Sequence, residues 1–399
     1  IATHCDPDDV GESWWGYQMA SRLSRRLDAT VLTLVKNGNP GQAASALPDA
    51  RVFECADWPL GRVHERLNAL LKPGYLKFHR FARRRIRALL ADGEFDLIHQ
   101  FTPLSMRYPS PGVGWGLPLI LGPYGGSVET PPGYEADMRA MASYTRLRRI
   151  DAWRFRVDPL LRRSLSSADL VLGVAPYVRD NLAAIPLRRF EVLLQTAITE
   201  LPDVGERPRD PERLRLLSVG RIIRTKGTIY LVRAMAHLNE LPGVTLDIVG
   251  DGDDRALCER EAASLGVSER IRFHGKRPRS EIDGFYRRAD LFVFPSLREP
   301  SGQVVLEAMS FGVPLIVMDR GGPGYTVRKE FGIRLAAGQP ENLPARLADA
   351  IRELRGAPQR LAAMGAAARE CIEEDYLWDR KIDRVLALYR SVLEAPERV

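Results

Sequence analysis

The sequence predicts a two-domain α/β protein in which each domain holds a parallel sheet covered by helices. Short apolar runs of strand length alternate with longer segments of helical pattern along almost the whole chain, which is typical of parallel sheets buried on both faces. The length of 399 residues corresponds to about two domains of ordinary size. A stretch rich in proline and charge, residues 202–211, separates two such series and predicts a linker.

The apolar runs place the individual strands. The first series predicts strands at residues 29–35, 96–100, 117–121 and 170–174. The second series predicts strands at residues 214–219, 244–249, 271–274, 291–295 and 314–318. A helix after nearly every strand indicates paired Rossmann-like domains, and residues 376–394 predict a final amphipathic helix. The chain also opens on a strand-like run, so we expect the natural start to lie upstream of Ile1.

Composition narrows the class of protein. The composition is that of a soluble globular protein, no apolar run has the length of a membrane-spanning helix, and no signal peptide is visible. The four cysteines are scattered, without a CxxC motif or Cys/His pairing. This spacing predicts a reducing, cytoplasmic location and argues against a zinc site.

Two stretches concentrate the positive charge. Residues 62–87 and 139–163 are rich in arginine and lysine and contain few acids, and the second stretch also carries Tyr144, Trp153 and Phe155. One interpretation is a solvated helix face. The other is peripheral contact with an anionic membrane at its inner face, where basic and aromatic residues cooperate. Nucleic acid would use the same charges, but no nucleic-acid-binding motif is present, so we expect no nucleic-acid partner.

The most informative segment surrounds Glu299 and Glu307. The apolar run 291–296 predicts a buried strand, and a helix is predicted from Val304 to Phe311 with Ser301 as its N-cap. The start of such a helix offers free N–H groups and a partial positive charge to a phosphate. Each carboxylate can accept hydrogen bonds from both hydroxyls of a vicinal diol. Together these groups predict a site for a nucleotide-sugar.

A second motif, residues 220–227, directly follows the strand that begins this series. Gly220 permits a tight turn at the carboxyl end of the strand, where α/β folds bind ligands. Arg221 and Lys226 are cations placed to reach one anion across this loop. Two exposed cations on a surface turn would have the same sequence, and the loop is neither a Walker A nor a GxGxxG motif.

The combination of both motifs is specific. The cation loop, the E-x7-E segment and the motifs between them resemble the retaining, GT-B-fold glycosyltransferases of family GT4. The intervening motifs are Val249-Gly250-Asp251-Gly252, Phe273-His274-Gly275, Ala289-Asp290-Leu291 and Pro295-Ser296. The resemblance implies two Rossmann-like domains facing across a cleft, with the C-terminal helix crossing back to the N-terminal domain. The domains would be residues 1–200, a linker at 201–212, residues 213–374, and the returning helix at 375–399.

The resemblance also implies roles for single residues. Arg221 and Lys226 would hold the donor diphosphate, Glu299 would face the transferred sugar, and Glu307 would take the ribose hydroxyls. The donor site would further include Ser301, Gly302, Gln303, Gly275 and Lys276. Pro300-Ser301-Gly302 stands where the family commonly has Gly-Phe-Gly, so the shape of the donor pocket is expected to differ. The turn at residues 321–324 follows the next strand and would border the cleft or serve as a plain turn.

Two glycine turns in the N-terminal half resemble family loops beside donor and acceptor. These are residues 9–16 and the GP-x-GG loop at 121–127. They place Gly11, Gly125 and Gly126 on the donor side, and Glu12, Ser13, Trp14, His99 and Tyr124 on the acceptor side. The family often has a histidine near the second loop, and this chain has Tyr124 with its flanking glycines there. His99 is only a weak substitute, because a histidine that ends a strand is more often structural.

Two acidic clusters could suggest a metal. Asp251-Gly252-Asp253 has the form of a DxD metal site, but it follows a predicted strand and is interpreted as a structural turn. Asp6-Pro7-Asp8-Asp9 has no accompanying ligand set. Because the cation loop can neutralise phosphate, we expect no metal and no cofactor besides the donor substrate.

We therefore expect a retaining sugar transfer from a nucleotide-diphosphate sugar to a glycan, lipid-linked or phospholipid acceptor, in polysaccharide or glycolipid biosynthesis. The alternatives are an epimerase or hydrolase of nucleotide-sugars that uses the same cleft, and a phosphorylase, which would need a pyridoxal lysine and a longer chain. A basic scaffold that binds membrane or nucleic acid leaves Glu299 and Glu307 unexplained. The sequence gives neither the base, the sugar, the linkage nor the oligomeric state.

Overall fold

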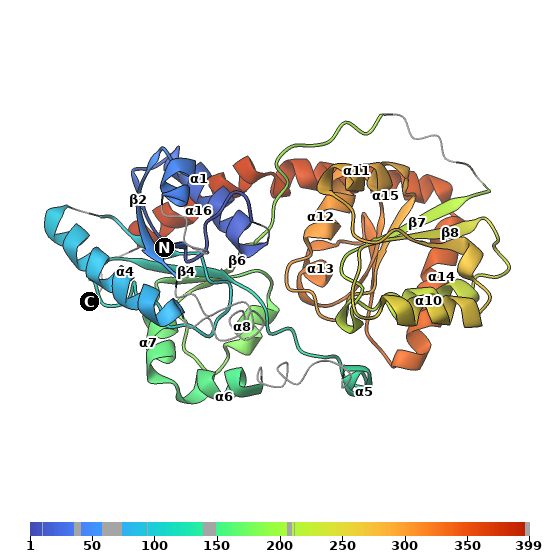
Figure 1. The fold of residues 1–399 in the computed structure, drawn as a ribbon, viewed down its shortest axis with the longest axis horizontal. Helices are drawn as coiled ribbons and strands as arrows, with labels where there is room; N and C mark the ends of the chain where they lie inside the picture. The colour runs from blue at the N-terminus through green and yellow to red at the C-terminus, as the bar shows by residue number, and fades with distance from the viewer. Residues whose placement is uncertain are drawn as a thin grey trace. The chain divides into compact units, whose positions relative to one another are not determined.

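The computed structural model describes residues 1–9, 11–35, 41–57, 74–93, 95–138, 149–205, 210 and 212–395. Within them the chain forms two compact units, each of the α/β class predicted from the sequence (Figure 1). Unit 1 comprises residues Ile1–Gly126, Arg146–Gln195 and Ile382–Val399, and unit 2 comprises Ser127–Thr145 and Thr196–Lys381. Each unit is described by itself.

Unit 1 contains parallel strands in two sheets. In one sheet β1 (Ala29–Val35) pairs in parallel with β2 (Ala50–Ala56). The other has the order β3-β4-β5-β6, from β3 (Ile98–Gln100), β4 (Leu119–Tyr124), β5 (Leu170–Gly173) and β6 (Phe190–Val192). Ala2 forms single parallel bridges to both Thr33 and Thr102. A cavity of about 710 Å³ is lined by the first halves of β1 and β3 and by apolar side chains of the surrounding helices.

The helices of unit 1 supply its apolar core. They are α1 (Glu12–Ser24), α2 (Gln42–Ala46), α4 (Gly74–Asp92), α6 (Arg149–Val157), α7 (Pro159–Ser167) and α8 (Tyr177–Asn181). The final helix, α16 (Trp378–Leu393), begins in unit 2, and its residues from Ile382 onward belong to unit 1. Phe78 and Ile86 of α4 pack against Leu32 and Leu34 of β1. The end of α16 thus belongs to the same unit as the N-terminal residues.

Unit 2 is built on one parallel sheet with the order β12-β11-β10-β7-β8-β9. The strands are β7 (Leu214–Val219), β8 (Val244–Val249), β9 (Ile271–Phe273), β10 (Leu291–Phe294), β11 (Leu315–Met318) and β12 (Gly332–Leu335). The order runs outward in opposite directions from the β10–β7 pair. This pair is a topological switch point, where the loops after the two strands diverge and leave room for a ligand.

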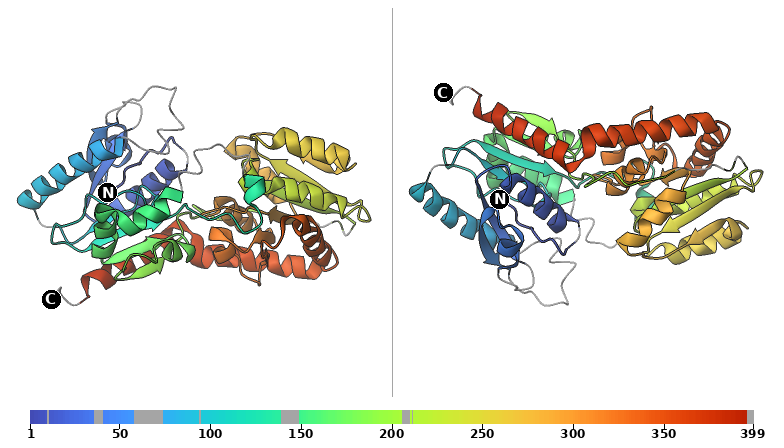
Figure 2. Two further views of the ribbon diagram at one scale, coloured as in Figure 1. Left: turned by 90° about the horizontal axis from the view of Figure 1, so that it is seen from below. Right: turned by 90° about the horizontal axis from the view of Figure 1, so that it is seen from above.

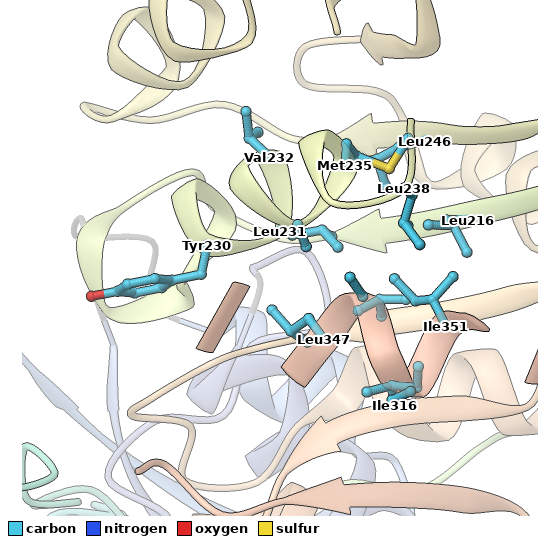
Figure 3. Close-up of a cluster of buried hydrophobic side chains, with 14 of the residues drawn as sticks. Leu216, Tyr230, Leu231, Val232, Met235, Leu238, Leu246, Ile316, Leu347 and Ile351 are labelled. Carbon is cyan, nitrogen blue, oxygen red and sulfur yellow. The ribbon is translucent and has the colours of Figure 1, made fainter. Parts of the chain in front are cut away.

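Helices cover both faces of this sheet (Figure 2). They are α9 (Thr228–Ala236), α10 (Arg255–Ser264), α11 (Arg279–Arg288), α12 (Gln303–Ser310), α13 (Gly321–Thr326), α14 (Leu343–Arg355) and α15 (Pro358–Cys371), with the short α5 (Glu135–Met138). Leu216, Leu246 and Ile316 of the strands meet α9 and α14 in one buried apolar cluster (Figure 3). On the other face, Tyr286 of α11 stacks on Phe311 after α12. Helices on both faces bury the central strands, which explains why β10 and β11 are apolar at every position.

The sequence located most strands to within two residues. It missed β2, β6 and β12, and it predicted a strand at residues 1–5, where the structure has only the bridges of Ala2. The division of the chain differs from the prediction mainly at Ser127–Thr145, which belongs to unit 2 although it lies between two parts of unit 1. Tyr134 explains this placement, since it is fully buried against Tyr230 of α9 and donates to Ala337 O at 2.9 Å. Residues 196–200 and 375–381 also belong to unit 2.

Candidate active site

The loops after β7 and β10, which flank the switch point, carry the two predicted motifs. The loop after β7 contains Arg221 and the short 3-10 turn Arg224–Lys226. Three groups from the loop after β10 donate to one acceptor, Thr225 O: Leu297 N at 2.9 Å, Arg298 N at 3.3 Å and Ser296 Oγ at 3.3 Å. Residues about 70 positions apart are thereby fixed side by side.

Gly227 makes this close approach possible. Its φ is +70°, and a Cβ added there would lie 2.2 Å from Pro295 O. A side chain would therefore meet both left-handed strain and a backbone clash. Gly227 also precedes α9, so the same residue ends the cation loop and starts the helix behind it.

Lys226 and Glu299 form an ion pair at the centre of the junction. The Lys226 ammonium donates to Glu299 Oε2, and the two side chains are only 14% and 15% exposed. Lys226 Nζ also lies 5.4 Å from the centre of the Phe294 ring. The other carboxylate oxygen of Glu299 accepts from Gly302 N at 3.1 Å and Ser301 N at 3.4 Å. Four of the predicted donor-site residues therefore converge on one point.

The start of α12 differs from the prediction. Gly302, not Ser301, is the N-cap residue, in a left-handed conformation with φ 79°, and α12 runs from Gln303 to Ser310. No side chain caps the helix from that position. The Ser301 interpretation was wrong by one residue, because Gly302 adopts the left-handed conformation between Ser301 and the first helical residue, Gln303.

Glu307 lies inside unit 2, with its side chain 6% exposed. Arg279 pairs with Oε1, the Tyr286 hydroxyl donates to Oε2 at 3.0 Å, and Gln303 also hydrogen-bonds to the carboxylate. Burial raises the pKa of Glu307, and Arg279, Tyr286 and Gln303 oppose that rise. The sequence reasoning missed Arg279 and Tyr286, since nothing in their spacing indicated that α11 lies against α12.

Two further segments border Glu299. Gly322 N donates to Glu299 O at 3.1 Å, and a Cβ on Gly321 would lie 2.0 Å from the same oxygen. Arg298 Nε donates to Val128 O at 2.9 Å, and Arg320 Nη2 donates to Glu129 O at 2.9 Å. Residues 321–324, predicted as a turn that borders the cleft or as a plain turn, begin α13 and lie beside Glu299, and the segment after residue 127 joins them.

The remaining donor-side predictions in unit 2 lie at the same edge of the sheet. Arg221 is exposed beside Gly220, and Lys276 is exposed after Gly275, whose φ is +69°. Gly250 N donates to Gly275 O at 2.9 Å, which ties the loop after β9 to the loop after β8. Asp251 accepts from Gly252 N at 2.8 Å, and a Cβ on Gly252 would lie 2.4 Å from Ile222 O. These contacts fit a packed turn at Asp251–Asp253.

The predicted residues of unit 1 fall into two places. Gly11 has φ 67° and precedes α1, whose first residue Glu12 accepts from Leu104 N at 2.8 Å. Ser13 is buried and Trp14 is half-buried in the same helix. In the other loop, Gly125 N donates to Leu104 O at 2.8 Å, and Gly126 has φ +83° with nothing within 4 Å of an added Cβ. The glycine turns of unit 1 thus meet at residue 104.

His99 and Tyr124 have core positions. The Nδ1 atom of His99 lies 2.7 Å from the Tyr389 hydroxyl, and its Nε2 lies 2.7 Å from Gly122 O. Burial lowers the pKa of His99 to about 3, so the ring is neutral. Tyr124 is 2% exposed within the apolar cluster of unit 1, and burial raises its pKa. Both positions favour structural roles over direct contact with an acceptor.

The described parts of the two basic stretches lie on helices of unit 1. Of the first stretch, residues 62–73 lie outside the described residues, and residues 74–87 belong to α4. Of the second stretch, residues 139–148 lie outside them, and its remainder forms α6 and α7. These two helices expose Trp153, Val157 and Leu160 at 61%, 47% and 65%. In the part of the chain that is described, no helix is both long enough and apolar enough to span a bilayer.

The fold and this junction define a class: a protein of two Rossmann-like units whose second unit carries two carboxylates, a lysine and the backbone N–H groups that precede α12 at a switch point. The family model described as glycosyl transferases group 1 matches residues 203–370. The model described as a glycosyl transferase 4-like domain matches residues 17–194. The chain belongs to the GT4-type glycosyltransferases of the GT-B fold.

Curated relatives match part of the chain. A D-inositol 3-phosphate glycosyltransferase 1 of Catenulispora acidiphila is 33% identical over 45% of this chain and 44% of its own length. The GDP-mannose-dependent alpha-(1-6)-phosphatidylinositol monomannoside mannosyltransferase of Mycolicibacterium smegmatis is 30% identical over 59% of this chain and 65% of its own length. The chain thus spans about half to two thirds of the length of these relatives.

Solved structures agree with the fold over nearly the whole chain. Sucrose-phosphate synthase from Thermosynechococcus elongatus superposes with a TM-score of 0.68 at 19% identity, covering 99% of this chain and 96% of that one. The structure of Anabaena Alr3699/HepE in complex with UDP gives a TM-score of 0.63 at 18% identity, covering 95% of each chain. At such identities the comparison establishes the fold alone.

Proposed function

We propose that the protein is a retaining glycosyltransferase that moves a sugar from a nucleotide-diphosphate sugar to a glycan, lipid-linked or phospholipid acceptor. One observation carries the proposal. The Lys226 ammonium, the Glu299 carboxylate and the N–H groups of Ser301 and Gly302 meet at the switch point of unit 2. A diphosphate needs such cations and N–H donors, and α/β sheets bind ligands at that place.

The groups divide the chemistry between them. When the sugar leaves, negative charge grows on the diphosphate while the anomeric carbon becomes cationic. Lys226, Arg221 and the start of α12 would stabilise the leaving diphosphate, because preorganised charges act without reorganisation. Glu299 would orient sugar hydroxyls, and the buried carboxylate of Glu307 would accept from the ribose. These cations could neutralise the diphosphate by themselves, so the proposal is of a transfer that needs no metal and no further cofactor.

Substitution of the two cations tests the proposal. Arg221→Ala and Lys226→Ala should each lower turnover by about two orders of magnitude, as expected for loss of one preorganised charge. Glu240→Gln is the control. Glu240 pairs with Arg352 at 2.8 Å and precedes β8, so it lies at the amino end of the strands, away from the loops that carry the site. Near-normal turnover in both cation variants at saturating donor would refute the assignment.

A screen of UDP-, GDP- and ADP-sugars, with and without acceptor, identifies the donor base and separates transfer from the alternatives. Hydrolysis or epimerisation at the same rate without acceptor would favour a nucleotide-sugar hydrolase or epimerase in the same site. Transfer that depends on the acceptor supports the proposed reaction. The GDP-mannose dependence of the mycobacterial relative makes GDP-mannose the first donor to test.

The acceptor is proposed to be presented at a membrane surface on the cytoplasmic side. One relative is named for a phosphatidylinositol mannoside and another, from Rhizobium meliloti, for lipopolysaccharide core biosynthesis. Exposed Trp153 and Leu160 stand among the arginines of α6 and α7, a pattern that suits an anionic interface. Flotation with anionic vesicles at low salt tests this. Binding should be lost in a Trp153→Ser/Leu160→Ser variant, and absence of wild-type binding would refute peripheral attachment.

A further inference from the structure

The contacts of Glu299 carry a second consequence for the same site. Its carboxylate uses Lys226 Nζ through one oxygen and the N–H groups of Ser301 and Gly302 through the other. These are the groups that the proposed function assigns to the donor diphosphate. We infer that Glu299 is an intramolecular competitor of the diphosphate, which must displace this carboxylate before it can bind. The inference rests on the proposed function and adds a control step to it.

Chemistry makes the competition direct. A carboxylate and a phosphate are both anionic acceptors, and a backbone N–H has one proton to donate. The two anions would also repel each other at the contact distances of this site, where both Lys226 and Glu299 are largely shielded from water. Lys226, with three donors, can turn toward either anion. The N–H groups of Ser301 and Gly302 must break their hydrogen bonds to the carboxylate before they can donate to the diphosphate.

The backbone of Glu299 is fixed by its neighbours, whereas its side chain is not. Gly322 N donates to Glu299 O, and a Cβ on Gly321 would meet that oxygen, so the backbone of Glu299 is fixed by the following loop. Thr225 O fixes the two residues before Glu299. The side chain alone can therefore move while its backbone stays in place. Release by the diphosphate frees the carboxylate for the sugar hydroxyls that the proposed function gives it.

This arrangement couples two events. The carboxylate that orients the sugar becomes available when the diphosphate has taken its partners, so a sugar without a diphosphate would not be engaged. The apparent affinity for the diphosphate equals the intrinsic affinity multiplied by the fraction of molecules in which the carboxylate does not occupy the site. If the carboxylate covers the site in about nine molecules of ten, its removal tightens diphosphate binding about tenfold.

Calorimetric titration with inorganic pyrophosphate, and then with UDP, GDP and ADP, tests the inference without knowledge of the sugar. Glu299→Gln keeps the shape of the side chain and removes its charge, and it should bind these ligands about tenfold more tightly than wild type. Turnover with the complete donor should fall in the same variant. Glu240→Gln removes one negative charge elsewhere in unit 2 and should bind as wild type does.

Each outcome is informative. Tighter binding together with lower turnover supports the competitor role, because a merely structural residue would weaken both. If wild type binds these ligands and Glu299→Gln binds them with the same or lower affinity, the inference is overturned and the proposed function still stands. Failure of wild type to bind pyrophosphate or any of the three nucleotides overturns the proposed function itself. Should Glu299→Gln not fold, Glu299→Ala serves as the second variant, with the same expected direction.

Discussion

Replacement of His99 by glutamine separates a structural histidine from a catalytic one. Its imidazole lies within 2.7 Å of both the Tyr389 hydroxyl and Gly122 O, and burial lowers its pKa to about 3. In the unfolded chain a histidine has a pKa of about 6.5. Between these two values the unfolded state binds a proton that the folded state excludes, so the contribution of His99 to stability falls as pH falls.

The magnitude follows from the pKa difference. At pH 7 the unfolded histidine is mostly neutral, and at pH 5 it is almost fully protonated, whereas His99 in the folded state stays neutral at both values because its pKa is about 3. The resulting loss of unfolding free energy between pH 7 and pH 5 is about 2 kcal/mol. His99→Gln should lack this loss. Other groups titrate equally in both proteins, so the difference between the two pH profiles isolates His99.

The assay is urea denaturation at pH 7 and pH 5, read by hydrogen exchange of peptides covering β3 and β4, which follows unit 1 by itself. Turnover at pH 7.5 provides the second readout. A structural His99 leaves turnover within about fivefold of wild type, whereas loss of a general acid or base costs a factor of about 10²–10⁴. Parallel pH profiles for wild type and variant, or a large loss of turnover in a folded variant, would refute the structural role.

Two further substitutions test the geometry of the site. Gly227→Ala should destabilise unit 2 by about 2 kcal/mol more than Gly266→Ala in urea denaturation, because both glycines have φ near +70° but only the Cβ at 227 would meet a backbone oxygen, at 2.2 Å. Pyrophosphate affinity should fall only in Gly227→Ala, and equal costs for the two variants would contradict the clash. Glu307→Gln should raise the KM for the donor about 10–100-fold, the effect of one charged hydrogen bond, while pyrophosphate binding stays the same. Steady-state kinetics and calorimetry check this, and unaltered KM would exclude Glu307 as the ribose ligand.

The strands of unit 2 could be predicted because most of their residues are apolar and buried. β10 and β11 are apolar at every position, whereas β7 and β8 are mainly apolar but include Arg215 and Asp247. The runs of β7, β8 and β10 each end at glycine or proline. β12 (Gly332–Leu335) has a half-exposed edge position with Arg334 in it, so it lacked that pattern. The sequence pattern did not predict β2 for the same reason, since only Cys55 of its seven residues is buried. A local apolar pattern predicts buried strands well. A partly exposed strand lacks that pattern, and its formation depends on pairing with a strand far away in the chain.

The site itself could be predicted in its residue types but not in its contacts. The E-x7-E spacing and the cation loop identified Lys226, Glu299 and Glu307, because these motifs are local. The partners of Glu307, which are Arg279 and Tyr286, come from α11, and only the packing of α11 on α12 brings them there. Ser301 was assigned as the N-cap from its residue type, whereas the left-handed conformation of Gly302 starts the helix one residue later. Residue type alone did not distinguish between these two starts.

The two carboxylates of the E-x7-E segment differ in how freely they can exchange partners. Glu307 is enclosed by α11 and α12 and is bonded to a tyrosine and an arginine whose side chain is 61% exposed, so a ribose can replace the arginine at the rim without opening the core. Glu299 lies in the loop after β10 with its side chain 15% exposed, and the inference above is that this side chain leaves Lys226 and the two N–H groups together. Under the proposed function, Glu307 on α12 would be a fixed ligand for the nucleoside, and Glu299 in the loop after β10 would be a movable ligand for the sugar. Because Glu299 pairs with Lys226, to which the proposal gives the diphosphate, recognition of the nucleotide would precede and permit engagement of the sugar.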